Sequence, residues 1–420
     1  MPKLQPSIFK VVTKLLFKFS IFLLIFFVHF KITTLYQEIN DFCQDYLSAS
    51  WVLHKLPAYQ PFNPYYCWGT KAKPFISIQY NAHPPTSLVF FIPFTLTSLP
   101  QATIFFDALS IGAFFLSMAF LLSIIRQLTP NRYLFALLCS TIWITLQLNY
   151  AVRNLTFLLL ALTSMAYYCT TVKKLRYAGI FIGLAALIKL WPAIFLIPVM
   201  FQKPLRPFLY TGLMIIFIGT VISILLFGPH NLTMYIFTVL PFEKTFFHTI
   251  NNISLPASLN KIGFNYSFIV PLFGLIWIIK RLITLFSSVS TDLYFAALFS
   301  LLSMGYFVFS PISWDHSAIQ LLLPLAIFLR YLKVYPHYLI HKYSLAISLS
   351  FLPLMVPHTI ELIDRGVGLL PPHHLLIILL HFVTVIFSCL PLLFILKFSR
   401  LITSTSLKKR PLLTIKTPKV

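Results

Sequence analysis

Apolar runs follow one another along nearly the whole chain. Most of them reach the roughly 18 residues that a helix needs to cross a bilayer. This pattern predicts an all-α polytopic membrane protein, a bundle of about 11–13 transmembrane helices that forms a single membrane-embedded domain over residues 1–420. The runs lie at about 19–30, 86–126, 133–150, 154–172, 177–201, 208–228, 266–285, 291–310, 317–335, 343–357 and 373–398.

Composition and charge agree with this prediction. The chain is 58% hydrophobic and carries 32 Lys and Arg against 9 Asp and Glu, which gives a formal charge of +23. In a soluble protein such an excess would indicate a nucleic-acid partner. Here the basic residues lie mainly in short loops and at both tails. Because the positive-inside rule accounts for that placement, we expect the lipid bilayer as a partner and no nucleic acid.

The first apolar run, 19–30, follows a basic segment and resembles a signal peptide, but no small-residue cleavage site follows it. We therefore expect a retained first helix with a cytoplasmic N-terminus. The long polar interval 36–85 then faces outward, and on the same alternation so does 229–265. Residues 336–420 supply the C-terminal helices and a basic tail.

Two basic residues leave part of this topology open. Arg126 and Arg132 lie in the cytoplasm only if one of the segments before them is re-entrant. The topology of residues 86–150 is therefore not fixed by the pattern.

The run 177–201 has basic residues on both sides and also one in its middle. If the flanks KKLR and QKPLR are both cytoplasmic, the run must be a hairpin of two short helices. Its tip would then carry Lys189 at the outer side, next to Trp191 and Pro192. Lys189 either neutralises a substrate charge there or extends from a helix end to the membrane interface.

Three of the nine carboxylates cluster at the start of the first polar interval. Glu38, Asp41 and Asp45 follow one another at spacings of three and four, so on a helix they project from one face. Like charges repel, and a solvated loop of so basic a protein would more naturally mix its signs. The cluster therefore predicts a site in which Asp41 or Asp45 acts as a general base. The alternatives for both residues are a solvated loop face and a helix N-cap.

A second group of ionisable residues lies in the stretch SPISWDHS between two apolar runs. Ionisable side chains at membrane depth are costly unless they pair or face a cavity, so Asp315 and His316 indicate a site. His316, Lys189 or Arg153 would neutralise an anionic leaving group such as a phosphate. The alternative is that Asp315 and His316 form a hydrogen-bonded pair that braces the turn.

Two further residues have simpler interpretations. His83 precedes two prolines and fits a loop better than a catalytic role. Asp107 lies inside an apolar run, where we expect it to satisfy a neighbouring polar group within the bundle.

The five cysteines are scattered, with no CxxC pair, so neither a zinc site nor a redox motif is encoded. Cys43 and Cys67 share the first polar interval. In an oxidising compartment they can form a disulfide, and two unpaired thiols are the alternative.

Five segments in the right order resemble one family. The residues from Asp41 to Tyr59 are similar to the pattern DFxxYYxAAxxLLxGxxPY, which opens the first outer loop of the polyprenol-phosphate-mannose-dependent mannosyltransferases, glycosyltransferase family 87. Tyr80 to Pro93 resembles the YxPPxxxLLxxP of that family. AGIFIGLAALIKLWPAIFLIP resembles its segment around a lysine, NISL its NQSL, and SPISWDH its most specific motif.

This resemblance implies a GT-C fold with its active site at the outer face. The donor would be a β-linked polyprenyl-phosphate sugar, usually mannose, and transfer to a hydroxyl of an envelope glycolipid or polysaccharide would invert it to an α-linked product without metal or cofactor. Asp41 would activate the acceptor hydroxyl, and His316 would meet the donor phosphate or help the proton move. The residues expected to bind substrate are Asp45, Tyr46, Tyr80, His83, Arg153, Lys189, Asn252, Ser254, Trp314 and Asp315.

The chain also departs from the family pattern. Asp45 stands where the family often has Tyr, Lys55 where it often has Gly, and Arg153-Asn154 where it often has Gly-Gln. These differences leave the sugar and the acceptor open. The alternative function is a transporter or flippase of a lipid-linked sugar. Transporters usually show paired halves with broken helices in corresponding positions, a pattern that the sequence does not display. We expect the protein in a bacterial inner membrane.

Overall fold

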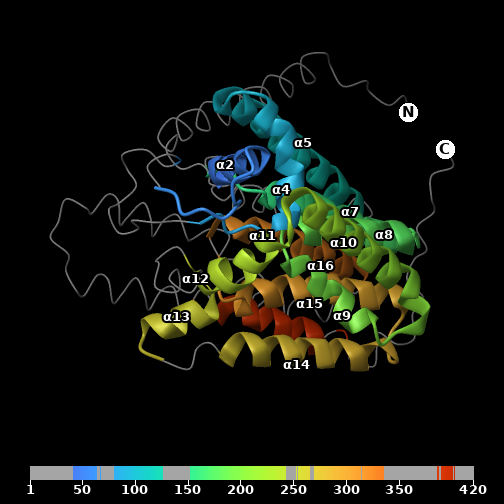
Figure 1. Ribbon diagram of the computed structural model, residues 1–420. Coiled ribbons are helices and arrows are strands. Elements are labelled where there is room, and N and C mark those ends of the chain that lie inside the picture. The colour runs from blue at the N-terminus through green and yellow to red at the C-terminus, as the bar shows by residue number, and fades with distance from the viewer. Residues whose placement is uncertain are drawn as a thin grey trace, which may run out of the picture.

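The structure is a computed structural model, and it describes residues 41–63, 67, 80–125, 152–242, 252, 254–264, 269–313, 315–334, 386, 389–400 and 402. The predicted first helix at 19–30 and the runs 133–150 and 343–357 lie outside the described residues. Within the described residues, all elements longer than a single bridge residue are helical (Figure 1).

The helices before residue 196 are α2 (Asp41–Leu53), α4 (Pro85–Phe91), η2 (Ile92–Leu96), α5 (Leu99–Ile125), α7 (Thr156–Thr171), α8 (Leu175–Ile188) and η3 (Trp191–Phe195). Those that follow are α9 (Leu196–Val199), η4 (Lys203–Leu205), α10 (Arg206–Phe227), α11 (Pro229–Met234), η5 (Tyr235–Val239), α12 (Leu240–Phe242), α13 (Leu255–Lys261), α14 (Ile269–Phe286), α15 (Thr291–Phe309), η7 (Asp315–Leu321) and α16 (Leu322–Val334).

In the described part of the chain, 4 helices are long and apolar enough to cross a membrane: α5, α10 together with the turn before it, α14 and α15. Large apolar side chains on α10 are exposed, with Phe217 at 68% and Leu225 at 78%. A soluble protein rarely leaves such a surface to water, whereas lipid solvates it. The protein is therefore an all-α polytopic membrane protein, as predicted.

Helix α15 lies at the centre of the bundle. Of the 18 residues that form its most apolar, membrane-length stretch, 89% are buried inside the bundle, against 17% for α10 and 17% for α14. Aromatic contacts join it to helices on several sides: Phe295 packs on Phe208, and Phe299 on both Tyr167 and Phe195. The core of the bundle is thus built around α15.

Helices α8 and α10 run parallel and in close contact. A Cβ added at Gly179 would lie 2.2 Å from the Phe208 carbonyl oxygen, and one at Gly183 would lie 2.8 Å from the Gly212 carbonyl oxygen. Residues later in α8 therefore meet residues later in α10. Small residues at such an interface let two backbones approach closely, which is how helices pack inside a membrane.

The predicted break in the run 177–201 is confirmed. Helix α8 ends at Ile188, Lys189 is extended with φ −140°, and the chain continues as η3 and α9. Because α10 starts beside Arg176 and Gly179, the residues after Lys189 must return along α8. Lys189 therefore lies at the tip of a hairpin, although its returning half is partly a 3₁₀ helix and not a second full α-helix.

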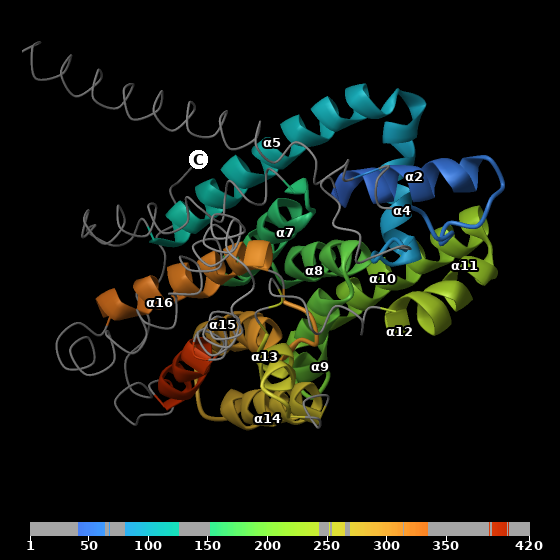
Figure 2. The same cartoon turned by 90° about the vertical axis from the view of Figure 1, so that its left-hand side faces the viewer.

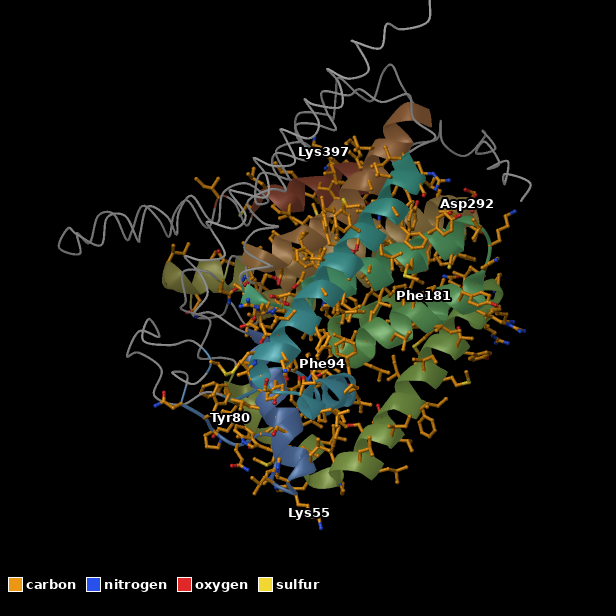
Figure 3. All side chains as sticks on the ribbon, turned by 90° about the horizontal axis from the view of Figure 1, so that it is seen from above. Lys55, Tyr80, Phe94, Phe181, Asp292 and Lys397 are labelled. Atoms are coloured by element: carbon orange, nitrogen blue, oxygen red, sulfur yellow. A yellow bond between two sulfur atoms is a disulfide. The ribbon has the colours of Figure 1, made fainter. Side chains whose placement is uncertain are left out.

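These contacts define two ends of the bundle. The Lys189 end contains the C-terminus of α8, the N-terminus of α7 and the C-terminus of α15, where Trp191 stacks on Tyr306 at 4.5 Å. The Lys173 end contains the α7–α8 turn, η4 and the N-terminus of α15. In Figure 3, Tyr80 and Asp292 mark these two ends.

The single apolar run 86–126 is divided into a short segment, α4 with η2, and the long helix α5. Helix α4 and η2 together span Pro85–Leu96 and are too short to cross the hydrocarbon core, while α5 is long enough. Contacts of Phe114 with Phe157 and of Phe120 with Tyr168 show that α5 runs parallel to α7, so it ends at the Lys173 end. This arrangement fits the re-entrant alternative, with α4 and η2 as the short segment.

Candidate active site

The residues singled out by the sequence gather at the Lys189 end. Figure 2 shows α4 lying between α2 and the ends of α8 and α10. Phe42, directly after Asp41, and Ile188, directly before Lys189, belong to one buried apolar cluster. The Thr86 hydroxyl at the start of α4 also donates to the Leu187 carbonyl oxygen at 2.6 Å. Helix α4 thus connects the helix that begins at Asp41 with the end of α8, so that Asp41 and Lys189 lie at the same end of the bundle.

Asp41 begins α2 and is partly exposed. Its Oδ2 accepts a hydrogen bond of 2.8 Å from Nδ2 of Asn154, a residue 113 positions later that lies two residues before α7 begins. The Thr156 hydroxyl donates to Oδ1 of Asn154 at 2.5 Å, which fixes the amide with its NH₂ group toward Asp41. Among the described residues, no other donor reaches the Asp41 carboxylate. It therefore keeps free acceptor positions for a proton.

Asp45, one turn later, is only 1% exposed and lies in a closed polar network. Its Oδ1 accepts from Asn81 Nδ2 at 3.0 Å and lies 2.8 Å from His83 Nδ1, while the His83 backbone N–H donates to Asn81 Oδ1 at 2.9 Å. Burial raises the pKa of the Asp45 carboxyl, and the contact with His83 opposes that rise.

The two polar intervals that were expected on one side of the membrane do pack together. The Ala58 N–H of the first interval donates to Asn231 Oδ1 of the second at 2.8 Å, and within the first interval the Tyr59 hydroxyl donates to the His83 carbonyl oxygen at 2.7 Å. Burial raises the pKa of Tyr59 well above its ordinary value, so its hydroxyl remains a donor. Asn231 belongs to the second interval, which is thereby fixed against the first.

Arg153 contacts a carboxylate on α5. Its Nε lies 3.0 Å from Asp107 Oδ1 and its Nη2 lies 3.2 Å from Oδ2. The expectation that Asp107 satisfies a polar group inside the bundle is confirmed. The positive charge of Arg153 is compensated by this pair, which weakens the case that it binds a substrate phosphate.

Asn252 and Ser254 hold the loop that leads into the SWDH stretch. Asn252 Nδ2 donates to the Pro311 carbonyl oxygen at 3.1 Å, and its Oδ1 accepts from the Ser313 N–H at 3.1 Å. The Ser254 hydroxyl also donates to the Pro311 carbonyl oxygen, at 3.2 Å. Both side chains are fully buried, so in this structure they brace the loop.

The backbone of Asp315 and His316 starts η7, which packs beside α7. Gln320 of η7 donates from Nε2 to the Thr156 carbonyl oxygen at 2.7 Å. The element that carries His316 is thus anchored two residues from Asn154, the partner of Asp41. Trp314 and the side chains of Asp315 and His316 lie outside the described residues.

The remaining predicted residues are partly buried aromatics of the same end. The Tyr46 hydroxyl donates to the Thr97 carbonyl oxygen at 2.8 Å, between η2 and α5. The Tyr80 ring meets Phe242 edge-on, with ring centroids 5.1 Å apart. Cys43 and Cys67 form a disulfide, which decides between the two alternatives for these thiols.

Several polar residues that form hydrogen bonds at the Lys189 end were not identified from the sequence. Asn81, Asn231 and Gln320 were not singled out, and neither was the role of Asn154 as a donor to Asp41. The one available signal was position: Asn81 lies two residues before His83, and Asn154 follows Arg153 at a departure from the family pattern. Pairings over 100 or more residues leave no trace in a single sequence.

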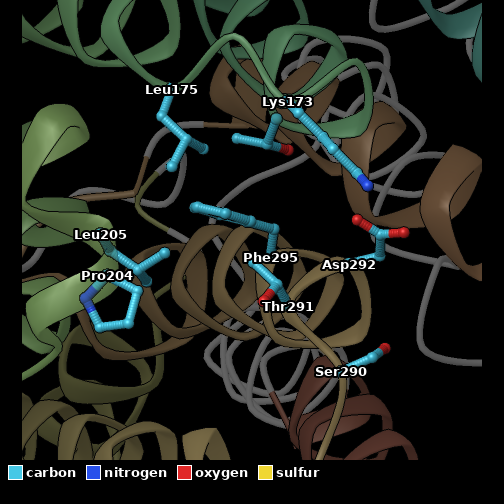
Figure 4. Close-up of a pocket in the computed structure, with 9 residues that line it drawn as sticks. Lys173, Leu175, Pro204, Leu205, Ser290, Thr291, Asp292 and Phe295 are labelled. Atoms are coloured by element: carbon cyan, nitrogen blue, oxygen red, sulfur yellow. The ribbon is translucent and has the colours of Figure 1, made fainter.

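A cavity of about 460 Å³ lies away from all these residues, at the Lys173 end. Figure 4 shows the Lys173 and Asp292 side chains pointing toward each other, and Phe295 is among the apolar residues that also line the cavity. Because it contains no residue of the Lys189 end, this cavity is not the candidate active site.

Comparison with known proteins gives one family. The model of glycosyltransferase family 87 matches residues 81–311, whereas no curated protein matches the chain. The matched part contains His83, Arg153, Lys189 and the Asn252 segment. Asp41 and His316 lie outside it. Since the match covers more than half of the chain, this protein belongs to glycosyltransferase family 87 and is a membrane glycosyltransferase.

Proposed function

We propose that this protein transfers a sugar, most simply mannose, from a polyprenyl-phosphate donor to a hydroxyl of an envelope glycolipid or polysaccharide. The observation that carries the proposal is the setting of Asp41. Its carboxylate is partly exposed, is bound on one oxygen by Asn154, and lies at the end of the bundle where the other motif segments meet.

Asp41 would act as the general base. Its carboxylate takes the proton of the acceptor hydroxyl while the hydroxyl oxygen attacks the anomeric carbon of the sugar. The bond between that carbon and the phosphate oxygen breaks, and polyprenyl phosphate leaves with the electron pair. Attack on the face opposite the phosphate inverts a β-linked donor to an α-linked product. The observed exposure favours Asp41 over Asp45, which is sealed against His83.

The developing phosphate charge needs a nearby cation. Arg153 already contacts Asp107, so we assign this role to Lys189 and His316. Lys189 lies at the hairpin tip, and η7 brings the backbone of His316 next to the start of α7. Fixed side-chain charges in a site with little water stabilise such an anion without reorganisation.

The Lys189 end would face the outer side of a bacterial inner membrane, with the N-terminus in the cytoplasm. Two observations support this orientation. The disulfide at the Lys189 end requires an oxidising compartment. Exposed basic residues mark the opposite end, as the positive-inside rule expects for the cytoplasmic side: Lys173, Lys174, Arg176, Lys203 and Arg206.

The test is to incubate the purified protein in nanodiscs with a panel of polyprenyl-phosphate sugars and to measure donor consumption and the anomeric form of the product. We expect consumption of the mannose donor and an α-linked product with a hydroxyl acceptor. Movement of intact donor across the bilayer of a liposome without its consumption would instead support the alternative, a flippase of a lipid-linked sugar.

A further inference from the structure

Arg153, which directly precedes Asn154, has a backbone conformation that residues other than glycine rarely adopt. Arg153 has a φ of 53°, in the left-handed region that favours glycine. This turn ends the segment before α7 and sets the direction from which Asn154 approaches Asp41. A left-handed arginine persists only where the surrounding structure holds it.

The contact that holds Arg153 in this conformation comes from Asp107 of α5. The Arg153 guanidinium contacts both oxygens of Asp107 at 3.0–3.3 Å, and both side chains are 16% exposed. A bidentate pair of this kind fixes direction as well as distance. Its charge-assisted hydrogen bonds therefore lock the side chain of a residue whose backbone is strained.

The same helix is fixed to α2 next to Asp41. Phe106, which precedes Asp107, stacks on Phe42 with ring centroids 4.5 Å apart and the planes tilted by 22°. The contacts thus form a closed triangle: α5 holds α2 through two rings, α5 holds Arg153 through an ion pair, and Asn154 donates to Asp41.

We infer that Arg153 is a positioning residue, which with Asp107 holds the left-handed turn that directs the Asn154 amide at Asp41. The inference rests on the proposed function, because it assigns Asp41 the role of base. It differs from the expectation for Arg153 from the sequence, in which this side chain binds the donor phosphate.

The two roles predict different kinetics. If Arg153 acts through the turn, Arg153→Gly keeps the left-handed backbone and loses only the ion pair, so kcat should fall a few-fold. Arg153→Ala loses the pair but keeps the left-handed strain, which nothing then holds, so kcat should fall by about tenfold or more. The KM for the donor should stay within about twofold for both variants. If Arg153 bound the phosphate, Gly and Ala would be equally impaired and both would raise KM.

A double-mutant cycle that combines Asp107→Asn with Arg153→Ala tests whether the ion pair of these two residues matters for kcat. In the Asp107→Asn background, Arg153→Ala should cost much less kcat than it does in the natural chain, since residues in contact are not additive. The matched control is Arg176→Ala, on the exposed side of α8 at the Lys173 end, which should leave kcat and KM unchanged.

The strain in the turn at Arg153 can also be measured independently of catalysis, from protein stability. The unfolding midpoint of Arg153→Gly should lie above that of Arg153→Ala, because glycine relieves the left-handed strain. Equal kcat and equal midpoints for Gly and Ala would overturn the positioning role and leave the proposed function standing. Absence of sugar transfer by the natural chain would overturn the proposed function, whatever the midpoints show.

Discussion

Asp45 and His83 lie 38 positions apart in the sequence, and their side chains meet at 2.8 Å in a buried pair that joins the beginning and the end of the polar interval 36–85. Asn81 bonds to both residues, and Tyr59 donates to the His83 carbonyl oxygen. The pair therefore joins α2 to the segment that leads into α4. It keeps the helix that carries Asp41 in register with the rest of the Lys189 end.

This burial predicts a pH dependence of stability. Because the Asp45 pKa is raised above its ordinary value of 3.8, the folded chain binds this proton more tightly than the unfolded chain. The contribution of Asp45 to the free energy of unfolding should therefore fall as the pH rises from about 3.8 through the raised pKa. Asp45→Asn keeps an acceptor oxygen but removes the ionisable carboxyl, and with it this pH-dependent contribution to the free energy of unfolding.

The measurement is the thermal unfolding midpoint in detergent across acidic pH. Relative to the natural chain, Asp45→Asn should gain stability as the pH rises, and His83→Gln in both backgrounds shows how much of that gain depends on the contact with His83. Parallel curves for Asp45→Asn and the natural chain would contradict the prediction.

Asp41→Asn should lower kcat by about a hundredfold or more, because it keeps the size and an acceptor for Asn154 but removes the basic group. Asp45→Asn should lower it less, since that carboxylate is buried against His83. Both are measured as donor consumption at saturating acceptor, with protein whose unfolding midpoint is known. The reverse order of the two effects would show that Asp45, with His83, is the base.

Gly179→Ala should destabilise the bundle by about 1–3 kcal/mol, because the added Cβ would lie 2.2 Å from the Phe208 carbonyl oxygen. The matched control is Gly112→Ala on α5, where nothing lies within 4 Å of the new methyl group. That variant should gain at most about 1 kcal/mol from helix propensity. Equal unfolding midpoints for the two variants would mean that α8 and α10 are further apart than the structure shows.

Reduction of the Cys43–Cys67 disulfide should lower the free energy of unfolding by about 3 kcal/mol, given the 24 positions between the two cysteines. It should also lower kcat, because Cys43 lies on α2 between Asp41 and Asp45. Reductant should therefore shift the unfolding midpoint of the natural chain and leave that of Cys43→Ser unmoved. Cys389→Ser, which removes an exposed free thiol, should behave like the natural chain, including its response to reductant.

Transfer activity should survive EDTA, since a lipid monophosphate carries less charge than the diphosphate of a nucleotide sugar, and Lys189 and His316 can offset it. Lys189→Ala should lower kcat in metal-free buffer. Activity that is lost in chelator and restored by magnesium or manganese would mean that the aspartates bind a metal and that Asp41 is not a free base.

Much of the fold could be predicted because a bilayer allows few solutions. Long apolar runs must be helices there, and the basic flanks of 177–201 required a reversal at Lys189. The split of 86–126 could not be read in the same way. The junction of η2 and α5 does carry polar residues, Thr97 and Ser98 followed by Pro100 and Gln101, but no charged one, and the run was therefore interpreted as continuous.

The candidate site was predictable by residue type but not by partner. Asp41 and its motif were identified, whereas the amide that binds it belongs to Asn154, a residue 113 positions later in the chain. Arg153 shows the limit most clearly. A lone cation suggested phosphate binding, and only the structure reveals its contact with Asp107 and the φ of 53°.

The central position of α15 has a consequence for how the bundle is made. Of the helices that pack on α15, α7 and α14 precede it in the chain and α16 follows it. Because the chain is synthesised from its N-terminus, the core of the bundle is completed only after Thr291–Phe309 has been made. A nascent chain cut short before Thr291 should therefore leave uncovered the faces of α7 and α14 that α15 buries.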